Sequence, residues 1–189
     1  CGSIINIREK CTAFDIKTKS SNIRDLIFVS IYNIDNRSYP FIAIEGNNNI
    51  IFNCKFNSNG ILVNGGNNNI IRDNILIDCY IGIEINSDNC NSVGNIIHNN
   101  LIMNCDSGII FKATSYWTIT NCFIRDNEIL DCMVGIKLYS AIKNNNKLSM
   151  NTIICNTITR GSGEQSSYSS LNENIIIVHG QNTKVCKNI

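Results

Sequence analysis

The sequence repeats a short pattern about every 26 residues, and this period limits the folds that the chain can adopt. In the segments 67–85, 95–111 and 122–138, an Asn is followed five residues later by a Cys and eight residues later by a Gly. A period of this length is typical of solenoids and other repeat arrays. The clear repeats cover 47–161, with weaker coils in 1–46 and 162–189, so we expect a single domain over residues 1–189.

Each repeat consists of short segments rich in Ile, separated by turns of Asn, Gly and Asp. Such segments favour β-strands over helices, and the period is too short for arrays of helix pairs. We therefore predict an all-β chain in which each repeat forms one coil of a single-stranded parallel β-solenoid. Strands of successive coils would then pair in parallel about 4.8 Å apart. The chain is long enough for about seven coils of roughly 20–29 residues.

The repeat also aligns equivalent residues into columns. One predicted column is a ladder of buried Asn side chains, which satisfies itself because each amide donates a hydrogen bond to the next. Its predicted members are Asn53, Asn74, Asn100, Asn127 and Asn156. A second Asn column is interrupted by one Cys and comprises Asn69, Asn95, Cys122 and Asn151. Columns of Ile and Leu on the inward side of the strands are expected to form the core.

The chain contains 10 Cys, which in a short chain is typical of disulfide scaffolds in oxidising compartments. Three of them, Cys79, Cys105 and Cys132, share one column, and we predict that they are free and buried because small apolar side chains pack well there. Two pairings are considered for the others: Cys1 with Cys11, and Cys122 with Cys155. The connectivity stays open at this point. No C-x-x-C motif and no zinc-like spacing occurs, so no metal site is predicted.

Composition excludes several classes of protein. The net charge is +1 and the basic residues are scattered, which argues against a nucleic-acid partner. The longest apolar runs have four or five residues, far fewer than a transmembrane segment needs. The start at Cys1, followed by Gly and Ser, resembles a processed bacterial lipoprotein with a lipid on its first residue. An arbitrary fragment end explains the same start.

One set of residues could carry chemistry. Three cationic or titratable residues are predicted to stack on consecutive coils beside two acids: Arg72, His98 and Arg125 next to Asp73 and Asp126. Such a face could clamp the carboxylate of a uronate, with the histidine as proton acceptor and the two acids as calcium ligands. The alternative is a solvated face on which Arg and Asp of neighbouring coils pair. No other cofactor is expected.

A further column is apolar where a polar residue would be expected on a surface. It comprises Phe56, Ile77, Met103 and Leu130. Strand alternation cannot send both this column and the neighbouring Leu and Ile column inward unless the chain bends there. Either a bend buries both columns, or an apolar stripe faces outward and meets another chain.

The core pattern N-x-I-x-x-C-x-x-G-I resembles the right-handed parallel β-helix repeat. This repeat occurs in pectate lyases, alginate epimerases, phage tailspikes, archaeal adhesin-like surface proteins and NosD-like periplasmic proteins. The resemblance implies a right-handed solenoid. It does not imply one activity, because this fold hosts many unrelated functions.

Two kinds of function follow as hypotheses. The first is a non-catalytic extracellular or cell-surface structural solenoid, such as a sheath, wall, fibre or adhesin component, which self-associates and for which glycan contact is left open. The second is a polysaccharide lyase, epimerase or hydrolase, or a phage or viral tailspike-like fragment. The paired Asp, G-H-G and R-x-K signatures typical of polygalacturonases are absent from the sequence, so we favour the structural hypothesis.

Overall fold

Every regular element in the described part of the chain is a short β-strand. The computed structural model describes residues 3–7, 12–30, 39–113, 116–140, 147–159, 175–178, 180–181 and 183–188. Within these ranges there are 25 strands and no helix. The strands form three large parallel sheets and one small sheet, named A to D.

Sheets A and B each contain seven strands, stacked in chain order. Sheet A consists of β1 (Ser3–Ile7), β4 (Leu26–Ser30), β7 (Lys55–Asn57), β10 (Ile75–Ile77), β14 (Leu101–Met103), β18 (Glu128–Leu130) and β22 (Thr157–Thr159). Sheet B consists of β2 (Phe14–Ile16), β5 (Ile42–Ile44), β8 (Ile61–Asn64), β11 (Ile81–Asn86), β15 (Ser107–Ala113), β19 (Val134–Ser140) and β23 (Ile175–Val178).

Sheet C also has seven strands, and sheet D has four. Sheet C consists of β3 (Asn22–Arg24), β6 (Ile50–Phe52), β9 (Ile70–Arg72), β13 (Ile96–His98), β17 (Phe123–Arg125), β21 (Thr152–Ile154) and β25 (Lys184–Cys186). Sheet D consists of β12 (Ser92–Val93), β16 (Ile119–Thr120), β20 (Leu148–Ser149) and β24 (Gly180–Gln181).

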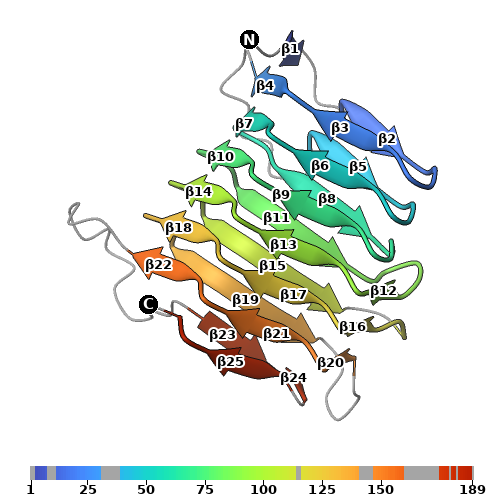
Figure 1. Ribbon diagram of the computed structural model, residues 1–189, viewed down its shortest axis with the longest axis vertical. Helices are drawn as coiled ribbons and strands as arrows, with labels where there is room; N and C mark the ends of the chain where they lie inside the picture. The colour runs from blue at the N-terminus through green and yellow to red at the C-terminus, as the bar shows by residue number, and fades with distance from the viewer. Residues whose placement is uncertain are drawn as a thin grey trace.

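The chain runs through sheets C, A and B in turn and then starts the next coil, which makes a parallel β-solenoid (Figure 1). The predicted fold class is therefore confirmed. The described strands make six complete passes through sheets C, A and B, with β1 and β2 before them and β25 after them, which is close to the seven predicted coils. In Figure 1 the coils lie one below another, from the N-terminal strands at the top to the C-terminal strands at the bottom.

The core is built from in-register columns of inward side chains. Ile71, Ile97 and Ile124 occupy equivalent places in neighbouring strands of sheet C, and each is at most 1% exposed. Near the N-terminal end the column of sheet A carries aromatic rings, and Phe28 stacks on Phe56 with 4.9 Å between ring centroids. Burying such columns is the main favourable term in folding.

Three corners connect the sheets, and each contains a residue with a left-handed backbone. Before sheet C these residues are Ser20, Asn48, Asn68, Gly94, Asn121 and Met150, and between sheets A and B they are Ser58, Asp78, Asn104 and Asp131. Between sheets C and A they are Asp25, Asn53, Asp73, Asn99, Asp126, Cys155 and Lys187. Asn and Asp tolerate this conformation better than other residues with side chains, which explains much of the Asn excess.

A column of glycines lies at the start of sheet B, where the chain leaves the corner. Sheet B places Gly60 beside Gly82, and the column continues to Gly108 and Gly135. A Cβ atom on Gly108 would lie 2.6 Å from the carbonyl oxygen of Gly135. The repeated Gly of the sequence is therefore needed for close approach of successive coils.

Candidate functional site

The residues that the sequence singled out for chemistry lie on the outer face of sheet C. In the register of this sheet, Arg72 in β9 pairs with His98 in β13, which pairs with Arg125 in β17. The same column continues toward the N-terminal end with Phe52 and Arg24. The structure thus brings the three candidate side chains onto one face of consecutive coils. A catalytic role for them stays a prediction.

Three arginines of this column contact the aspartate that follows them, and the longest contact joins Arg24 Nε to Asp25 Oδ2 over 3.7 Å. Arg72 Nη1 contacts Asp73 Oδ2, and Arg125 Nη1 lies 2.6 Å from Asp126 Oδ2. Arg72 also lies over the ring of Phe52, with its Cζ atom 4.4 Å from the ring centroid. Exposed ion pairs of this kind add little stability. Because each charge has an opposite charge beside it, the face carries no strong field to attract a carboxylate.

The two aspartates of the candidate site lie on coils that are two apart. The register places Asn99 between Asp73 and Asp126 in the column of turn residues. Two coil spacings separate the backbones of the aspartates by about 10 Å. Their φ angles of 56° and 55° show that both residues serve the turn. A role of these aspartates as calcium ligands stays a prediction.

His98 lies between the two arginines in a half-buried position. Its Nδ1 atom is buried and has no hydrogen-bond partner. Burial lowers the pKa of the imidazole and the charge of Arg125 lowers it further, whereas Asp73 acts in the opposite direction. The neutral imidazole is thus favoured. Chemically, this side chain can accept a hydrogen bond or a proton from a hydroxyl group that reaches it.

The predicted Asn ladder is present at the corner between sheets C and A. Asn74 Nδ2 donates to Asn100 Oδ1 over 3.1 Å, and Asn100 Nδ2 donates to Asn127 Oδ1 over 3.0 Å. The same carbonyl oxygens also accept backbone N–H groups of the preceding coil. The ladder continues through Asn156 to Asn188. The repeat pattern predicts Asn156 as a member but not Asn188.

The prediction that Asn53 belongs to this ladder is wrong. Sheet A pairs Lys55 with Ile75, so Cys54 lies opposite Asn74, and its N–H donates to Asn74 Oδ1 over 3.0 Å. Asn53 is the preceding turn residue with a φ of 53°, and its Nδ2 donates to Asp25 Oδ1 over 2.6 Å. Asn is favoured both in a left-handed turn and in a ladder, so residue type alone could not separate the two places.

A second Asn ladder lies at the corner before sheet C. Asn69 Nδ2 donates to Asn95 Oδ1 over 3.2 Å, and Cys122 interrupts the column as predicted. The Cys122 N–H donates to Asn151 Oδ1 over 3.0 Å, so the backbone contact of the ladder is kept across the interruption. Asn49 extends this ladder toward the N-terminal end, donating to Asn69 Oδ1 over 3.1 Å.

The three column cysteines follow the turn residues between sheets A and B. All three are free; Cys79 and Cys105 are buried, whereas Cys132 is half-buried. The considered disulfide between Cys122 and Cys155 is wrong, because both thiols are free and the residues flank opposite ends of the strands of sheet C. Burial raises the pKa of the Cys122 thiol to about 12. The considered pair of Cys1 and Cys11 lies outside the described residues.

The structure divides the apolar column predicted at Phe56, Ile77, Met103 and Leu130. The last three pair in register on the outer face of sheet A and are half-buried. Phe56 is wholly buried in the inward column of the same sheet, and Asn57 takes the outer place. Phe56 is therefore corrected from a candidate interface residue to a core residue. As at Asn53, the alignment of the repeats matched this residue with a position one place away from its partner in the sheet.

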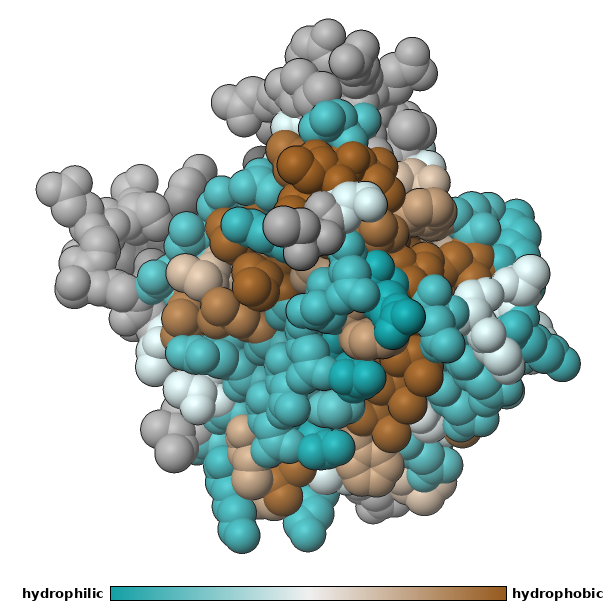
Figure 2. Space-filling view, turned by 45° about the horizontal axis from the view of Figure 1, so that its top comes forward, coloured by the Kyte–Doolittle hydropathy of each residue, from teal (hydrophilic) through white to brown (hydrophobic). Residues whose placement is uncertain are grey.

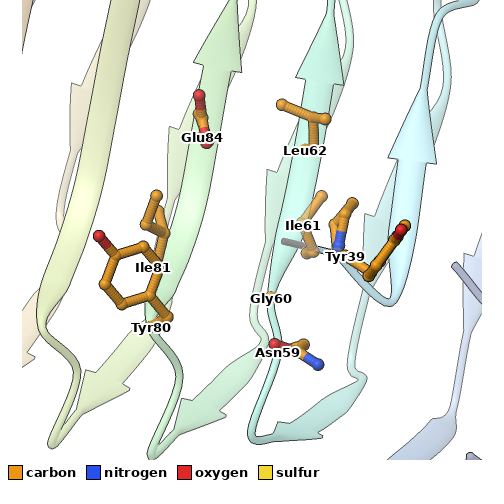
Figure 3. Close-up of a pocket in the computed structure, with 9 residues that line it drawn as sticks. Tyr39, Asn59, Gly60, Ile61, Leu62, Tyr80, Ile81 and Glu84 are labelled. Carbon is orange, nitrogen blue, oxygen red and sulfur yellow. The ribbon is translucent and has the colours of Figure 1, made fainter. Parts of the chain in front are cut away.

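A small open pocket on the outer side of sheet B was not indicated by the sequence (Figure 3). It has a volume of about 90 Å³ and is lined by Tyr39, Pro40, Asn59, Gly60, Ile61, Leu62, Tyr80, Ile81 and Glu84. Figure 3 shows Tyr39 and Tyr80 on either side of Ile61. Burial raises the pKa of the Glu84 carboxyl, although Lys112 Nζ, 4.0 Å away, acts in the opposite direction. Tyr39 lies outside the clear repeats and Tyr80 stands at a variable place within one, so the pattern could not reveal them.

The described residues contain neither a membrane-spanning helix nor a cluster of metal ligands. None of their elements is a helix long and apolar enough to cross a membrane. No group of three or more His, Cys, Asp or Glu side chains in this part of the chain is arranged to hold a metal ion.

Comparison with known proteins gives one result. No curated protein and no solved structure matches the chain. The family model described as periplasmic copper-binding protein (NosD) matches residues 12–188, which include all the coils with clear repeats. The parallel solenoid agrees with the β-helix resemblance of the repeat. The chain therefore belongs to the NosD family.

Proposed function

We propose that the protein is a non-catalytic structural solenoid of the periplasm or cell surface that associates with a second copy of itself. The observation that carries this proposal is an apolar patch on the outer face of sheet A. This sheet A patch consists of Ile75, Ile77, Leu101, Met103 and Leu130. The description of the family as periplasmic supports the location.

The sheet A patch has the form of two short outward columns. Ile75 pairs with Leu101 in one column, and Ile77, Met103 and Leu130 follow each other in the next. Ile75 is 38% exposed and the other four are half-buried. Figure 2 shows that hydrophobic surface borders a hydrophilic band on the visible side of the molecule. Contiguous apolar surface of this kind marks interaction sites in soluble proteins.

Charges at the two ends of the sheet A patch favour a second copy as the partner. Lys55 precedes Ile75 in its column, and Glu128 follows Leu101. Both charged residues are exposed. A two-fold axis parallel to the strands reverses the order of coils in the partner, so each Lys55 would face a Glu128 of the other copy. The two copies also share one coil spacing, which lets their side-chain ridges interlock.

Sedimentation velocity on the full chain, in the presence of a reductant, tests this proposal. We expect a concentration-dependent dimer that Met103→Glu converts to a monomer, because the carboxylate would be buried in the apolar contact. Phe123→Glu is the matched control: Phe123 is 42% exposed but lies on sheet C, so the dimer should persist.

A charge exchange gives a second, more specific test. Lys55→Glu should weaken the dimer, and adding Glu128→Lys to it should restore the dimer by re-forming the pair in reversed order. A wild-type chain that stays monomeric at the highest soluble concentration would overturn the proposal. A dimer whose affinity changes neither with Met103→Glu nor with the charge exchange would also overturn it.

Glycan contact is a second candidate function, and the pocket on sheet B favours it. Tyr39 and Tyr80 are 45% and 37% exposed, and exposed rings beside a few polar groups suit a ligand with apolar faces and hydroxyls. Titration calorimetry with a panel of neutral and acidic oligosaccharides tests it. We expect binding that Tyr80→Ala abolishes and that Tyr116→Ala, at an 86% exposed ring outside the pocket, leaves unchanged.

The proposed function does not include copper, although the description of the family names it. The described residues offer no group of three or more side chains suited to a metal ion. The stacked thiols of sheet A's corner are engaged in hydrogen bonds to carbonyl oxygens, as at Cys105 Sγ, 3.2 Å from Met103 O. The residues that the structure describes therefore do not fit a copper centre, and no step is derived through one.

A further inference from the structure

The cysteine column at the corner between sheets A and B places three thiols in direct succession. Cys79, Cys105 and Cys132 each follow a residue with a left-handed backbone, so they leave the corner in the same direction. Backbone hydrogen bonds keep them in step, from Asp106 N to Cys79 O over 3.2 Å and from Met133 N to Cys105 O over 3.1 Å. Equivalent residues of neighbouring coils lie about 4.8 Å apart.

This spacing suits a disulfide between neighbouring coils. Cα atoms of disulfide-bonded cysteines are usually about 4.4–6.8 Å apart, and the coil spacing lies within that range. The thiols of Cys105 and Cys132 take the same position in their coils, since each donates to the carbonyl oxygen two residues earlier, Cys105 Sγ to Met103 O over 3.2 Å and Cys132 Sγ to Leu130 O over 3.5 Å.

The two thiols differ in their access to a reagent. Cys105 is 2% exposed, whereas Cys132 is half-buried and is the outermost member of the column in the described coils. The neighbouring Cys105 thiol, together with burial, raises the pKa of the Cys132 thiol. Reaction should therefore be slow at neutral pH and faster at higher pH, since the thiolate is the reacting form.

We propose that Cys105 and Cys132 form a reversible disulfide that links two neighbouring coils, with Cys132 as the thiol that first meets a small disulfide oxidant. The Cys132 thiol loses its proton, and its sulfur attacks one sulfur of the oxidant, whose S–S bond breaks to release one thiol. The Cys105 sulfur, after losing its proton, then attacks Cys132 Sγ and releases the second thiol. Two protein thiols are oxidised and one small disulfide is reduced to two thiols.

The compartment of the family agrees with this chemistry. The family description names the periplasm, where disulfides form and persist. The third cysteine of the column is not required. Cys79 lies one coil further from Cys132 than Cys105 does, at about twice the coil spacing, beyond the reach of a disulfide.

Peptide mapping of the full chain after treatment with oxidised glutathione tests the proposal. Trypsin cuts after Arg125 and Lys137, and Cys132 is the only cysteine in 126–137. The partner peptide, 73–112, contains Cys79, Cys90 and Cys105, so fragmentation of the linked pair assigns the bond. We expect a Cys105–Cys132 bond that forms several-fold faster at pH 9 than at pH 7 and disappears on reduction.

Matched variants separate this bond from other thiol chemistry. Cys79→Ser and Cys90→Ser should keep the linked peptides, whereas Cys132→Ser and Cys105→Ser should lose them. Cys105→Ala serves as a second variant in case a buried hydroxyl prevents folding, and circular dichroism checks the strand content of each. A glutathione adduct on Cys132 without a link to Cys105, or a link through Cys79 or Cys90, would overturn the proposal. A higher thermal midpoint of the oxidised chain, reversed by reductant, would support it.

Discussion

At the scale of single residues, each corner of the solenoid contains two consecutive residues with different roles. The first has a left-handed backbone and turns the chain, and the second points inward and joins a column. Asp73 and Asn74 show the division: Asp73 has a φ of 56°, and Asn74 is 1% exposed within the ladder. The same division explains why Asn53 and Asn74 looked equivalent in the sequence although they occupy different places.

The ladder at the corner between sheets C and A should contribute strongly to stability. Asn100→Ala removes the oxygen that accepts Asn74 N and Nδ2, and the amide that donates to Ile71 O over 3.0 Å. Several buried polar groups lose their partners, so we expect the free energy of unfolding to fall by about 3 kcal/mol or more. Urea denaturation measures it.

Asn99→Gly is the matched control for the ladder variant. Asn99 is the exposed turn residue next to Asn100, with a φ of 54° that glycine adopts without strain. We expect a change of roughly 0.5 kcal/mol or less. Equal losses in the two variants would show that the ladder is not the stabilising element at this corner.

His98 should titrate below its ordinary pKa of 6.5. Because the fold favours the neutral imidazole, its contribution to stability is present above pH 6.5 and is lost as the pH falls through the lowered pKa. NMR titration of the His98 ring measures the pKa, with His179→Asn removing the other histidine signal.

Two arginine variants show which charge acts on His98. Arg125→Met should raise the pKa of His98 toward 6.5, because the charge of Arg125 disfavours the imidazolium. Arg24→Met, in the same column but two strands before Arg72, should leave it unchanged. A His98 pKa at or above 6.5 in the unmodified chain would contradict the buried position of Nδ1.

At the scale of the strands, the sequence predicted inward columns well and outward columns poorly. Ile71 and Ile97 were assigned to the core correctly because each repeat carries an aliphatic residue at that place. In β10 and β14, however, all three residues of each strand are apolar. A strand of only three apolar residues has no polar residue that marks its outer side. Only the structure therefore shows that Ile77 and Met103 lie on the outer face of the sheet.

The candidate site was predicted in part for the same reason. The stacking of Arg72, His98 and Arg125 follows from the repeat length alone, because equivalent residues must align once the coils are in register. The repeat length does not predict which side chains these three residues contact. Whether Asp73 would meet a ligand or Arg72 depends on side-chain geometry that a repeat pattern does not contain.

The glycine column makes a prediction at this scale. Gly108→Ala places a Cβ atom 2.6 Å from Gly135 O and 2.8 Å from Ile129 Cγ2. Both atoms belong to the packed interior of the next coil, so we expect a loss of about 2–3 kcal/mol in the free energy of unfolding. Thermal and urea denaturation measure this loss.

Gly94→Asn is the control for the glycine column. Gly94 has a φ of 68° in the corner before sheet C, where neighbouring coils carry Asn68 and Asn121 in the same conformation. Its added Cβ would meet only the end of the Asn68 side chain. The stability should change by about 1 kcal/mol or less. A larger effect at Gly94 than at Gly108 would contradict the role assigned to the column.

At the scale of the whole molecule, each coil contacts only the coils next to it. Stability in such an array depends on the intrinsic stability of each coil and on its interfaces with neighbours. Strands β13, β14 and β15 are paired on both sides, whereas β2 and β3 are paired on one side. Because pairing is between residues far apart in sequence, folding should also be slow.

Hydrogen exchange should therefore follow position in the array. We expect amides of β13 to β15 to exchange at least 100-fold more slowly than those of β2 and β3, as opening of a central coil breaks two interfaces rather than one. Exchange measured by mass spectrometry on the full chain checks this order. Uniform exchange across all coils would indicate one cooperative unit instead of a nearest-neighbour array.

The Asn ladders give the solenoid a dipole along its axis. In both ladders Oδ1 accepts from the N-terminal side, as Asn100 Oδ1 does from Asn74 and Asn69 Oδ1 from Asn49, so these carbonyl dipoles point the same way. Strand dipoles largely cancel in a sheet, and those of the ladders add. The N-terminal side thus carries the partial negative charge and the C-terminal side the partial positive charge. Two copies that lie side by side in reversed order set these dipoles antiparallel, which is the arrangement of lower electrostatic energy.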